Sequence, residues 1–217
     1  MSEPRLVLAS QSPRRCELLR LLGFPFAVTA ADVRETPRAG ETPAELVTRL
    51  SRAKADGARP FDRNNRLVIG CDTIVALEGD ILGKPRGANE AKAMLHRLRG
   101  RSHVVYSGIT LLDPADRAAT ELAETRLTMR AYSEAEISAY VASGDPLDKA
   151  GGYAIQHEGF HPVDEIEGCY SNVMGLPLCH LARSLRNWGI EPATDVPTVC
   201  QAHTGHRCVV YQEIMTR

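Results

Sequence analysis

The apolar run Leu67–Leu77 constrains the fold more than any other part of the sequence, because only Asp72 and Thr73 interrupt it. An apolar run of this kind that leads into a turn, here Glu78–Asp80, predicts a buried strand. Shorter segments predict further strands at residues 5–9, 26–30, about 103–112 and 121–131, and a short one after the glycine-rich segment 151–159.

Helices alternate with these strands, and their boundaries follow from capping residues. Ser12 and Pro13 begin the first helix, and a capping box at Thr42–Glu45 begins the second. Three more helices are predicted: one ending at Leu98, one running from the capping box Ser133–Glu136 to Gly144, and one ending near Trp188. Because helices and strands mix along the whole chain, we expect an α/β or α+β architecture with one main sheet.

Charge and composition exclude several classes of protein. The 217 residues carry a formal net charge of −1, so we expect neither nucleic acid nor a membrane as a partner. No apolar stretch reaches the roughly 18 residues of a transmembrane helix, and the N-terminus has no signal-peptide core. The six cysteines are too sparse for a disulfide scaffold, and the first four lie in apolar surroundings that favour reduced, buried thiols. We therefore expect a cytoplasmic location.

The segment Ser10–Arg15, at a strand-to-helix junction, is the first signal of chemistry. A helix N-terminus carries free N–H groups and partial positive charge, so Arg14 and Arg15 are unfavourable in its first turn unless an anion binds there. With the hydroxyls of Ser10 and Ser12, they predict a phosphate site. The alternative is a capped surface helix with two solvated arginines.

Asp72 is the second signal, since a carboxylate within an apolar strand is costly unless a cation, metal ion or donor meets it. It is a candidate general base or metal ligand; a structural Asp, satisfied by backbone amides or facing solvent, is the alternative. Lys54, and Lys84 in the loop Gly83–Pro85, are candidates to neutralise charge in phosphoryl chemistry, and each alone is equally typical of a solvated side chain.

Residues 191–217 change character and are interpreted as an appended tail without clear periodicity. Three interpretations of its polar residues stay open: a metal site, a disulfide, or a flexible tail with incidental side chains. The residues concerned are Cys200, His203, His206 and Cys208.

Six motifs together resemble the Maf family of nucleoside triphosphate pyrophosphatases in order and spacing. The motifs are Leu8–Arg15, Gly70–Thr73, Gly83–Pro85, Leu147–Gly151, Tyr153–Gln156 and Val173–Pro177. The resemblance covers about residues 5–189. We therefore predict a Maf-like domain over residues 1–190, with the tail 191–217 outside the family pattern.

The resemblance implies a fold and an activity. Such proteins have an α/β fold in which helices flank a mixed, twisted central sheet with a deep nucleotide-binding cleft, usually as homodimers. They hydrolyse the α–β phosphoanhydride of a nucleoside triphosphate to a monophosphate and pyrophosphate, a house-cleaning reaction. They need a divalent cation, for which we expect Mg²⁺, with Mn²⁺ or Co²⁺ as substitutes.

The resemblance also assigns roles to single residues. Asp72 matches the catalytic acid of the family, and Lys54 and Lys84 match its two catalytic lysines. Glu35 matches a metal-site acid, with Asp72 as the second ligand. The residues predicted to bind the substrate are Ser10, Ser12, Arg14, Arg15, Thr73 and Gln156.

Arg14, Thr73 and Gln156 resemble the branch of the family that acts on dTTP and UTP. The Gln156 amide offers a donor and an acceptor that match the N3–H and O4 edge of uracil or thymine. His157 departs from the family pattern beside Gln156, which keeps other pyrimidine nucleotides and modified purine nucleotides such as 7-methyl-GTP as alternative substrates. A protein that senses a nucleotide without turnover is the rival hypothesis.

Overall fold

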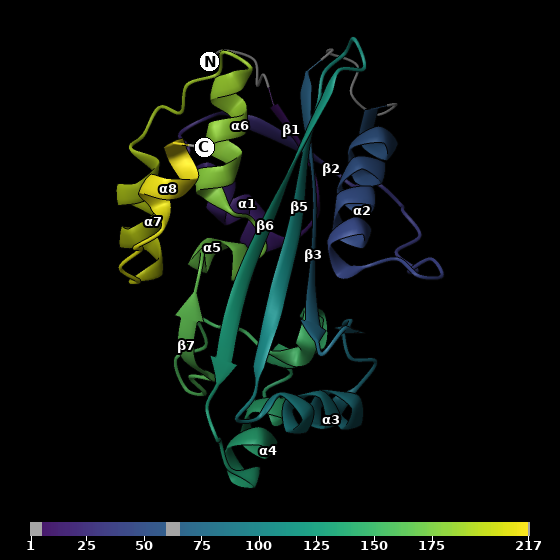
Figure 1. Cartoon of the computed structure of the whole chain (residues 1–217), viewed down its shortest axis with the longest axis vertical. Helices are drawn as coiled ribbons and strands as arrows, with labels where there is room; N and C mark the ends of the chain where they lie inside the picture. Colours follow the sequence, from purple (N-terminus) through teal and green to yellow (C-terminus); the bar gives the residue numbers. More distant parts are fainter. Residues whose placement is uncertain (1–5, 60–65, 217) are drawn as a thin grey trace.

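The computed structural model of the chain describes residues 6–59 and 66–216. Its centre is one sheet with the strand order β2-β1-β3-β5-β6-β7, in which β4 also pairs with β3 (Figure 1). The strands are β1 (Leu6–Ala9), β2 (Phe26–Thr29), β3 (Leu67–Leu77), β4 (Asp80–Leu82), β5 (Ser102–Leu112), β6 (Ala118–Met129) and β7 (Val163–Glu167).

The sheet is mixed, as expected. β1 pairs in parallel with both β2 and β3, whereas β3, β5, β6 and β7 pair successively in antiparallel. The interrupted apolar run is β3, which lies in the interior of the sheet between β1 and β5. The α/β fold with a mixed central sheet is therefore confirmed.

The helices begin where their capping residues predict. Ser12 caps the first, and the capping boxes at Thr42 and Ser133 are both formed. The helices are α1 (Pro13–Arg20), α2 (Pro43–Ala58), α3 (Ala88–Leu98), α4 (Glu134–Ala142), α5 (Tyr170–Val173), α6 (Leu178–Asn187), α7 (Val196–Thr204) and α8 (Tyr211–Thr216).

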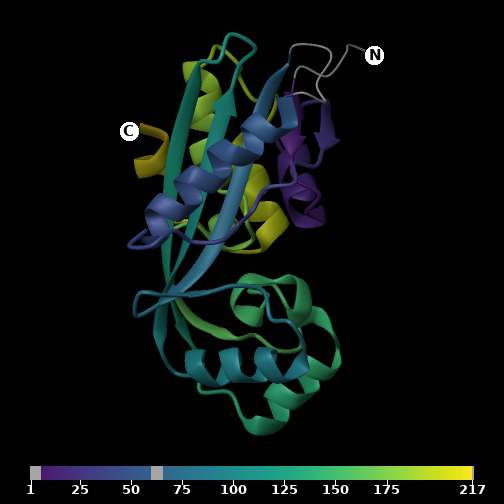
Figure 2. The same cartoon turned by 90° about the vertical axis from the view of Figure 1, so that its right-hand side faces the viewer.

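The long strands β3, β5 and β6 join two lobes (Figure 2). In the upper lobe, α2 covers one face of the sheet, while α1, α6, α7 and α8 lie on the other (Figure 1). In the lower lobe, α3 and α4 pack with two short 3₁₀ helices, η2 (Asp145–Asp148) and η3 (Ala150–Gly152). Each lobe has its own apolar core, so the two form separate packing units on one sheet.

Two glycines allow α2 to lie close against the sheet. A Cβ on Gly70 would clash with the backbone oxygen of Ser51, and a Cβ on Gly108 would clash with that of Val47. This close approach carries Lys54, one turn further along α2, to the side chain of Asp72 on β3.

The tail is folded, contrary to the flexible-tail interpretation. α7 and α8 pack near α6, and Val196 is fully buried in the core of the upper lobe. The Thr194 hydroxyl also donates a 2.7 Å hydrogen bond to the Leu21 carbonyl oxygen. Sequence periodicity missed α7 and α8 because both are short and no strong apolar stripe marks them.

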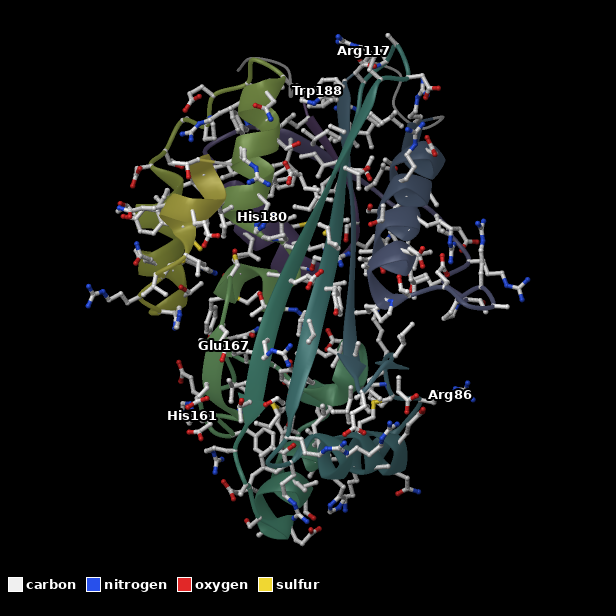
Figure 3. All side chains as sticks on the ribbon, in the orientation of Figure 1. Arg86, Arg117, His161, Glu167, His180 and Trp188 are labelled. Atoms are coloured by element: carbon white, nitrogen blue, oxygen red, sulfur yellow. The ribbon has the colours of Figure 1, made fainter. Side chains whose placement is uncertain are left out.

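A cation–π contact lies at the upper end of the molecule (Figure 3). The Arg117 guanidinium, next to β6, lies 5.2 Å from the centroid of the Trp188 ring (Figure 3). No helix formed by the described residues is both long enough and apolar enough to cross a bilayer.

Candidate active site

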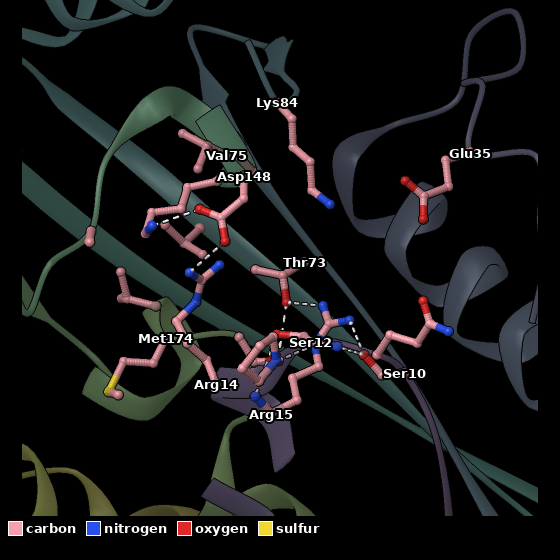
Figure 4. Close-up of a pocket in the computed structure, with 18 of the residues that line it drawn as sticks. Ser10, Ser12, Arg14, Arg15, Glu35, Thr73, Val75, Lys84, Asp148 and Met174 are labelled. Carbon is pink, nitrogen blue, oxygen red and sulfur yellow. Dashed lines mark hydrogen bonds and ion pairs between the residues drawn. The ribbon is translucent and has the colours of Figure 1, made fainter. Parts of the chain in front are cut away.

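A cavity of about 420 Å³ lies between the two lobes. Its walls come from β1, the start of α1, the segment before α2, β3 and residues 148–156 of the lower lobe (Figure 4). It has the place and size of a small-ligand site. All but one of the predicted site residues line it: Ser10, Ser12, Arg14, Arg15, Glu35, Lys54, Thr73, Lys84 and Gln156.

The wall formed by α1 has the features of an anion site. The Ser12 side chain caps the helix by accepting from the Arg15 N–H, and the Ser10 hydroxyl accepts from the Ser12 N–H at 3.2 Å. No acidic side chain occupies the first turn of α1. The positive end of the helix dipole therefore faces the cavity together with two guanidinium groups.

Arg15 is held in place by three acceptors. It donates to the Gly175 carbonyl oxygen at 2.8 Å, to the Ser10 hydroxyl at 3.2 Å and to the Thr73 hydroxyl at 3.1 Å. Thr73 is in turn hydrogen-bonded to the buried Ser107 hydroxyl at 2.8 Å. Arg15 is thus a pre-oriented cation on the cavity wall.

Lys54 joins two carboxylates at the edge of the cavity. Its Nζ lies 2.5 Å from an oxygen of Glu35 and 2.5 Å from an oxygen of Asp72. Burial raises the pKa of Glu35, but the hydrogen bond and charge of Lys54, with Lys84 and Arg15, outweigh it and hold that pKa below its ordinary value. Glu35 is therefore ionised at neutral pH.

Asp72 is the one predicted site residue that does not line the cavity. Successive side chains of a strand point to opposite faces of the sheet, so Thr73 faces the cavity while Asp72 faces α2. The Asp72 side chain is buried behind Lys54 and reaches the cavity through that lysine. Of the partners that the sequence left open for this carboxylate, the structure shows a cation, Lys54.

Lys84 supplies a further positive charge. Its side chain extends into the cavity from the segment after β4 (Figure 4). Four cationic side chains that the sequence predicted at the site thus line the cavity, and their summed charge favours binding of a polyanion. They are Arg14, Arg15, Lys54 and Lys84.

The lower lobe contributes two charged residues whose roles the sequence did not reveal. Asp148 lies 3.4 Å from Arg14, and Lys149 donates to Asp148 at 2.6 Å and to Asp145 at 2.9 Å. Both Asp148 and Lys149 line the cavity. Both residues lie within the family-like motif Leu147–Gly151, and this was the only feature of the sequence that pointed to them.

Gln156 lines the cavity, whereas its neighbour His157 does not. The His157 ring accepts a 3.0 Å hydrogen bond from the Phe160 N–H and packs on the Tyr140 ring, with the centroids 4.7 Å apart. His157 therefore belongs to the packing of the lower lobe and does not line the site.

The tail residues that suggested a metal site turn to different neighbours. His206 stacks on Tyr170, and His203 lies 3.8 Å from a Glu17 oxygen. Cys200 and Cys208 are free thiols that line a small void with Cys169. Within residues 6–59 and 66–216, no three His, Cys, Asp or Glu side chains form a group that could hold a metal ion.

Comparisons with known proteins identify the family. The family model described as Maf-like protein matches residues 5–188. A dTTP/UTP pyrophosphatase from Geotalea uraniireducens is 46% identical over 87% of this chain and 97% of its own length. One from Salinibacter ruber is 49% identical, over 83% and 89% respectively.

A solved HAM1 protein from Coxiella burnetii aligns over 97% of this chain and 96% of its own, at 16% identity and a TM-score of 0.46. The family model, in contrast, spans most of the chain, and its relatives share nearly half of their residues with it. The chain belongs to the Maf family.

Proposed function

We propose that this protein is a nucleoside triphosphate pyrophosphatase that hydrolyses dTTP and UTP to the monophosphate and pyrophosphate. The observation that carries this proposal is the cavity that combines four cations with Lys54-bound carboxylates and Gln156. The names of relatives 44–49% identical to this chain support it. CTP and modified pyrimidine nucleotides are further candidate substrates.

The residues of the cavity divide the work. The triphosphate binds with its phosphates at the start of α1, on Ser10, Ser12, Arg14 and Arg15. Lys54 and Lys84 stabilise the negative charge that grows as pyrophosphate leaves. Asp72, which lies behind Lys54, takes the proton of the attacking water by relay: Lys54 gives one ammonium proton to Asp72 and accepts the water proton in its place.

Glu35 and Asp72 are the carboxylates that would hold a divalent cation, and the phosphates of the bound substrate would supply further ligands. Two carboxylates that already meet at one ammonium supply hard oxygen donors, and Mg²⁺ is commonly held by one or two carboxylates with substrate phosphates and water. When bound, Mg²⁺ neutralises phosphate charge, and Mn²⁺ or Co²⁺ would serve in its place. Activity that disappears on chelation and returns with Mg²⁺ would support this assignment.

The base preference is assigned to Gln156. Its amide pairs with the donor and acceptor edge of uracil or thymine, and it lies on the lower-lobe wall of the cavity, while the phosphate cradle lies on the upper. A protein site built to hydrogen-bond one base edge rejects a base that leaves those groups unpaired.

The test incubates the purified protein with Mg²⁺ and UTP, dTTP, CTP, GTP, ATP or 7-methyl-GTP, and separates the products by chromatography. Monophosphate and pyrophosphate from UTP and dTTP are expected. The same products from a purine nucleotide alone would retain the reaction and overturn the base assignment. Diphosphate and phosphate as products would show cleavage of the β–γ bond and contradict the proposed reaction. Tight nucleotide binding without turnover would favour a protein that senses a nucleotide.

We also propose that the protein is a cytoplasmic homodimer, the state that the family resemblance implies. The six free cysteines support a reducing compartment. Light scattering on the purified protein gives the mass in solution, and a monomer would contradict the dimer.

A further inference from the structure

One ion pair between residues that line the cavity bridges the two lobes. Arg14 Nη1, at the start of α1 in the upper lobe, lies 3.4 Å from Asp148 Oδ2, at the end of η2 in the lower lobe (Figure 4). Both residues line the cavity. The bridge therefore joins the phosphate cradle to the lobe that carries Gln156.

Asp148 is anchored on its own lobe even though its side chain is 65% exposed. Its Oδ1 accepts from Lys149 Nζ at 2.6 Å. The Lys149 ammonium is buried and also donates to the carbonyl oxygen and Oδ1 of Asp145, at 2.6 and 2.9 Å. Asp145 accepts in turn from the Tyr140 hydroxyl at 2.6 Å. A fixed network thus sets the position of the Asp148 carboxylate.

Arg14 is held far less firmly than Arg15. Within the described part of the chain, Asp148 is the only carboxylate in ion-pair distance of Arg14, whereas three acceptors hold Arg15. A guanidinium has five N–H donors, so a single carboxylate orients it and leaves donors for a phosphate.

Charge supports the same arrangement. Burial raises the pKa of Asp148, but Lys149 and then Arg14 outweigh it and hold the pKa below its ordinary value, so the carboxylate is ionised at neutral pH. Lys149 offsets much of the negative charge that Asp148 brings near the phosphates.

We propose that Asp148 is a positioning residue, whose carboxylate, anchored by Lys149, holds the Arg14 guanidinium across the cavity in the orientation that binds the polyphosphate. This inference rests on the proposed function, since it concerns the same site. Asp148 itself touches no phosphate; it spares the substrate the cost of ordering a long, flexible side chain.

The first test measures binding without turnover. Calorimetry compares wild type with Asp148→Asn for two probes: tripolyphosphate, which has no base, and α,β-methylene-dTTP. We expect the affinity for both to fall by about tenfold, with KM raised equally and kcat within about twofold of wild type. A loss for the dTTP analogue alone would place Asp148 on the base side and overturn the proposal.

The second test is a double-mutant cycle with Arg14→Ala. If Asp148 acts through Arg14, adding Asp148→Asn to Arg14→Ala changes the tripolyphosphate affinity by less than about twofold. A merely structural role gives additive losses, and additive losses overturn the proposal.

Two matched substitutions control for charge. Asp145→Asn removes a negative charge near Lys149 but keeps an oxygen that accepts from it and leaves the Arg14–Asp148 contact in place, so an equal loss of tripolyphosphate affinity at unchanged melting temperature would overturn the proposal. Asp164→Asn, on β7 outside the cavity, is expected to leave the affinity at the wild-type value. The two proposals can fail separately. A protein that releases no pyrophosphate would contradict the proposed function, whereas tripolyphosphate binding would still test the role of Asp148.

Discussion

At the scale of single residues, the site depends on the alternation of side chains along β3. Asp72 and Thr73 are neighbours in the chain but face opposite sides of the sheet. Thr73 helps to orient Arg15, while Asp72 is buried behind the cavity wall and pairs with Lys54. One interruption of an apolar strand thus supplies both a positioning hydroxyl and a buried carboxylate.

Replacement of Asp72 tests the catalytic assignment. Asp72→Asn keeps the shape of the side chain and removes its charge, so we expect kcat to fall by about a hundredfold or more, because the proposed base and the buried partner of Lys54 are both lost. Pyrophosphate release measures the change, with Asp164→Asn as the control. Near wild-type turnover would show that Asp72 is structural.

His103 gives a prediction about pH. It is buried in the lower lobe, with its Nε2 2.6 Å from the Tyr153 hydroxyl, and burial lowers its pKa to about 4. The folded state therefore resists protonation of His103, which the unfolded state accepts near pH 6.5. The stabilising contribution of the neutral ring is present at neutral pH and is lost as the pH falls from about 6.5 to about 4.

We expect the free energy of unfolding in urea to fall by about 2 kcal/mol between pH 7.5 and pH 5 through His103 alone. His103→Gln removes the titrating group, so its unfolding free energy should fall by correspondingly less over the same interval. Identical pH dependence in the two proteins would contradict this account.

At the scale of elements, the packing of α2 on the sheet positions Lys54. Gly70 and Gly108 leave no side chain between the helix and the strands, so the backbones approach closely. The capping box at Thr42 fixes where α2 begins and therefore which of its residues face β3. Lys54 reaches Asp72 because both conditions are met.

Gly70→Ala tests this arrangement. Its Cβ would meet the Ser51 carbonyl oxygen and the Ala55 N, both backbone atoms of α2, so the helix must move away from β3. We expect the unfolding free energy to fall by about 1–3 kcal/mol and kcat to fall with it, as Lys54 leaves Asp72. Gly87→Ala is the control, because open space surrounds that glycine; equal stability of the two variants would contradict the close approach.

At the scale of the whole molecule, the cavity exists because two lobes share one sheet. The cationic start of α1 lies on the upper lobe and Gln156 on the lower, and the long strands β3, β5 and β6 join the two lobes (Figure 2). The tail adds to the upper lobe by completing its core on the side of α1 and α6.

Val196→Ala tests the contribution of the tail. Val196 is fully buried against residues of α1 and α6, so its truncation leaves a cavity and should lower the unfolding free energy by about 1–3 kcal/mol. Val209→Ala, at a side chain 83% exposed in the same tail, should have no measurable effect. Thermal unfolding compares the two, and equal melting temperatures would show that the tail does not stabilise the fold.

The sequence by itself determined the features that depend on neighbours in the chain. Helix starts at Ser12, Thr42 and Ser133 follow from capping hydrogen bonds that span three residues, and the buried strand follows from a continuous apolar run. The grouping of Ser10, Ser12, Arg14 and Arg15 on one wall of the cavity could also be predicted, since a helix N-terminus and its arginines lie within one short segment.

Only the tertiary structure decided which distant residues meet. The contacts of Lys54 with Glu35, of Arg14 with Asp148 and of Val196 with the upper core join segments far apart in sequence. No local pattern encodes such pairs, because their free energy comes from packing and from charges brought together in space. The sequence therefore specified the kinds of groups that the site uses, and the fold determined their partners and the faces on which they lie.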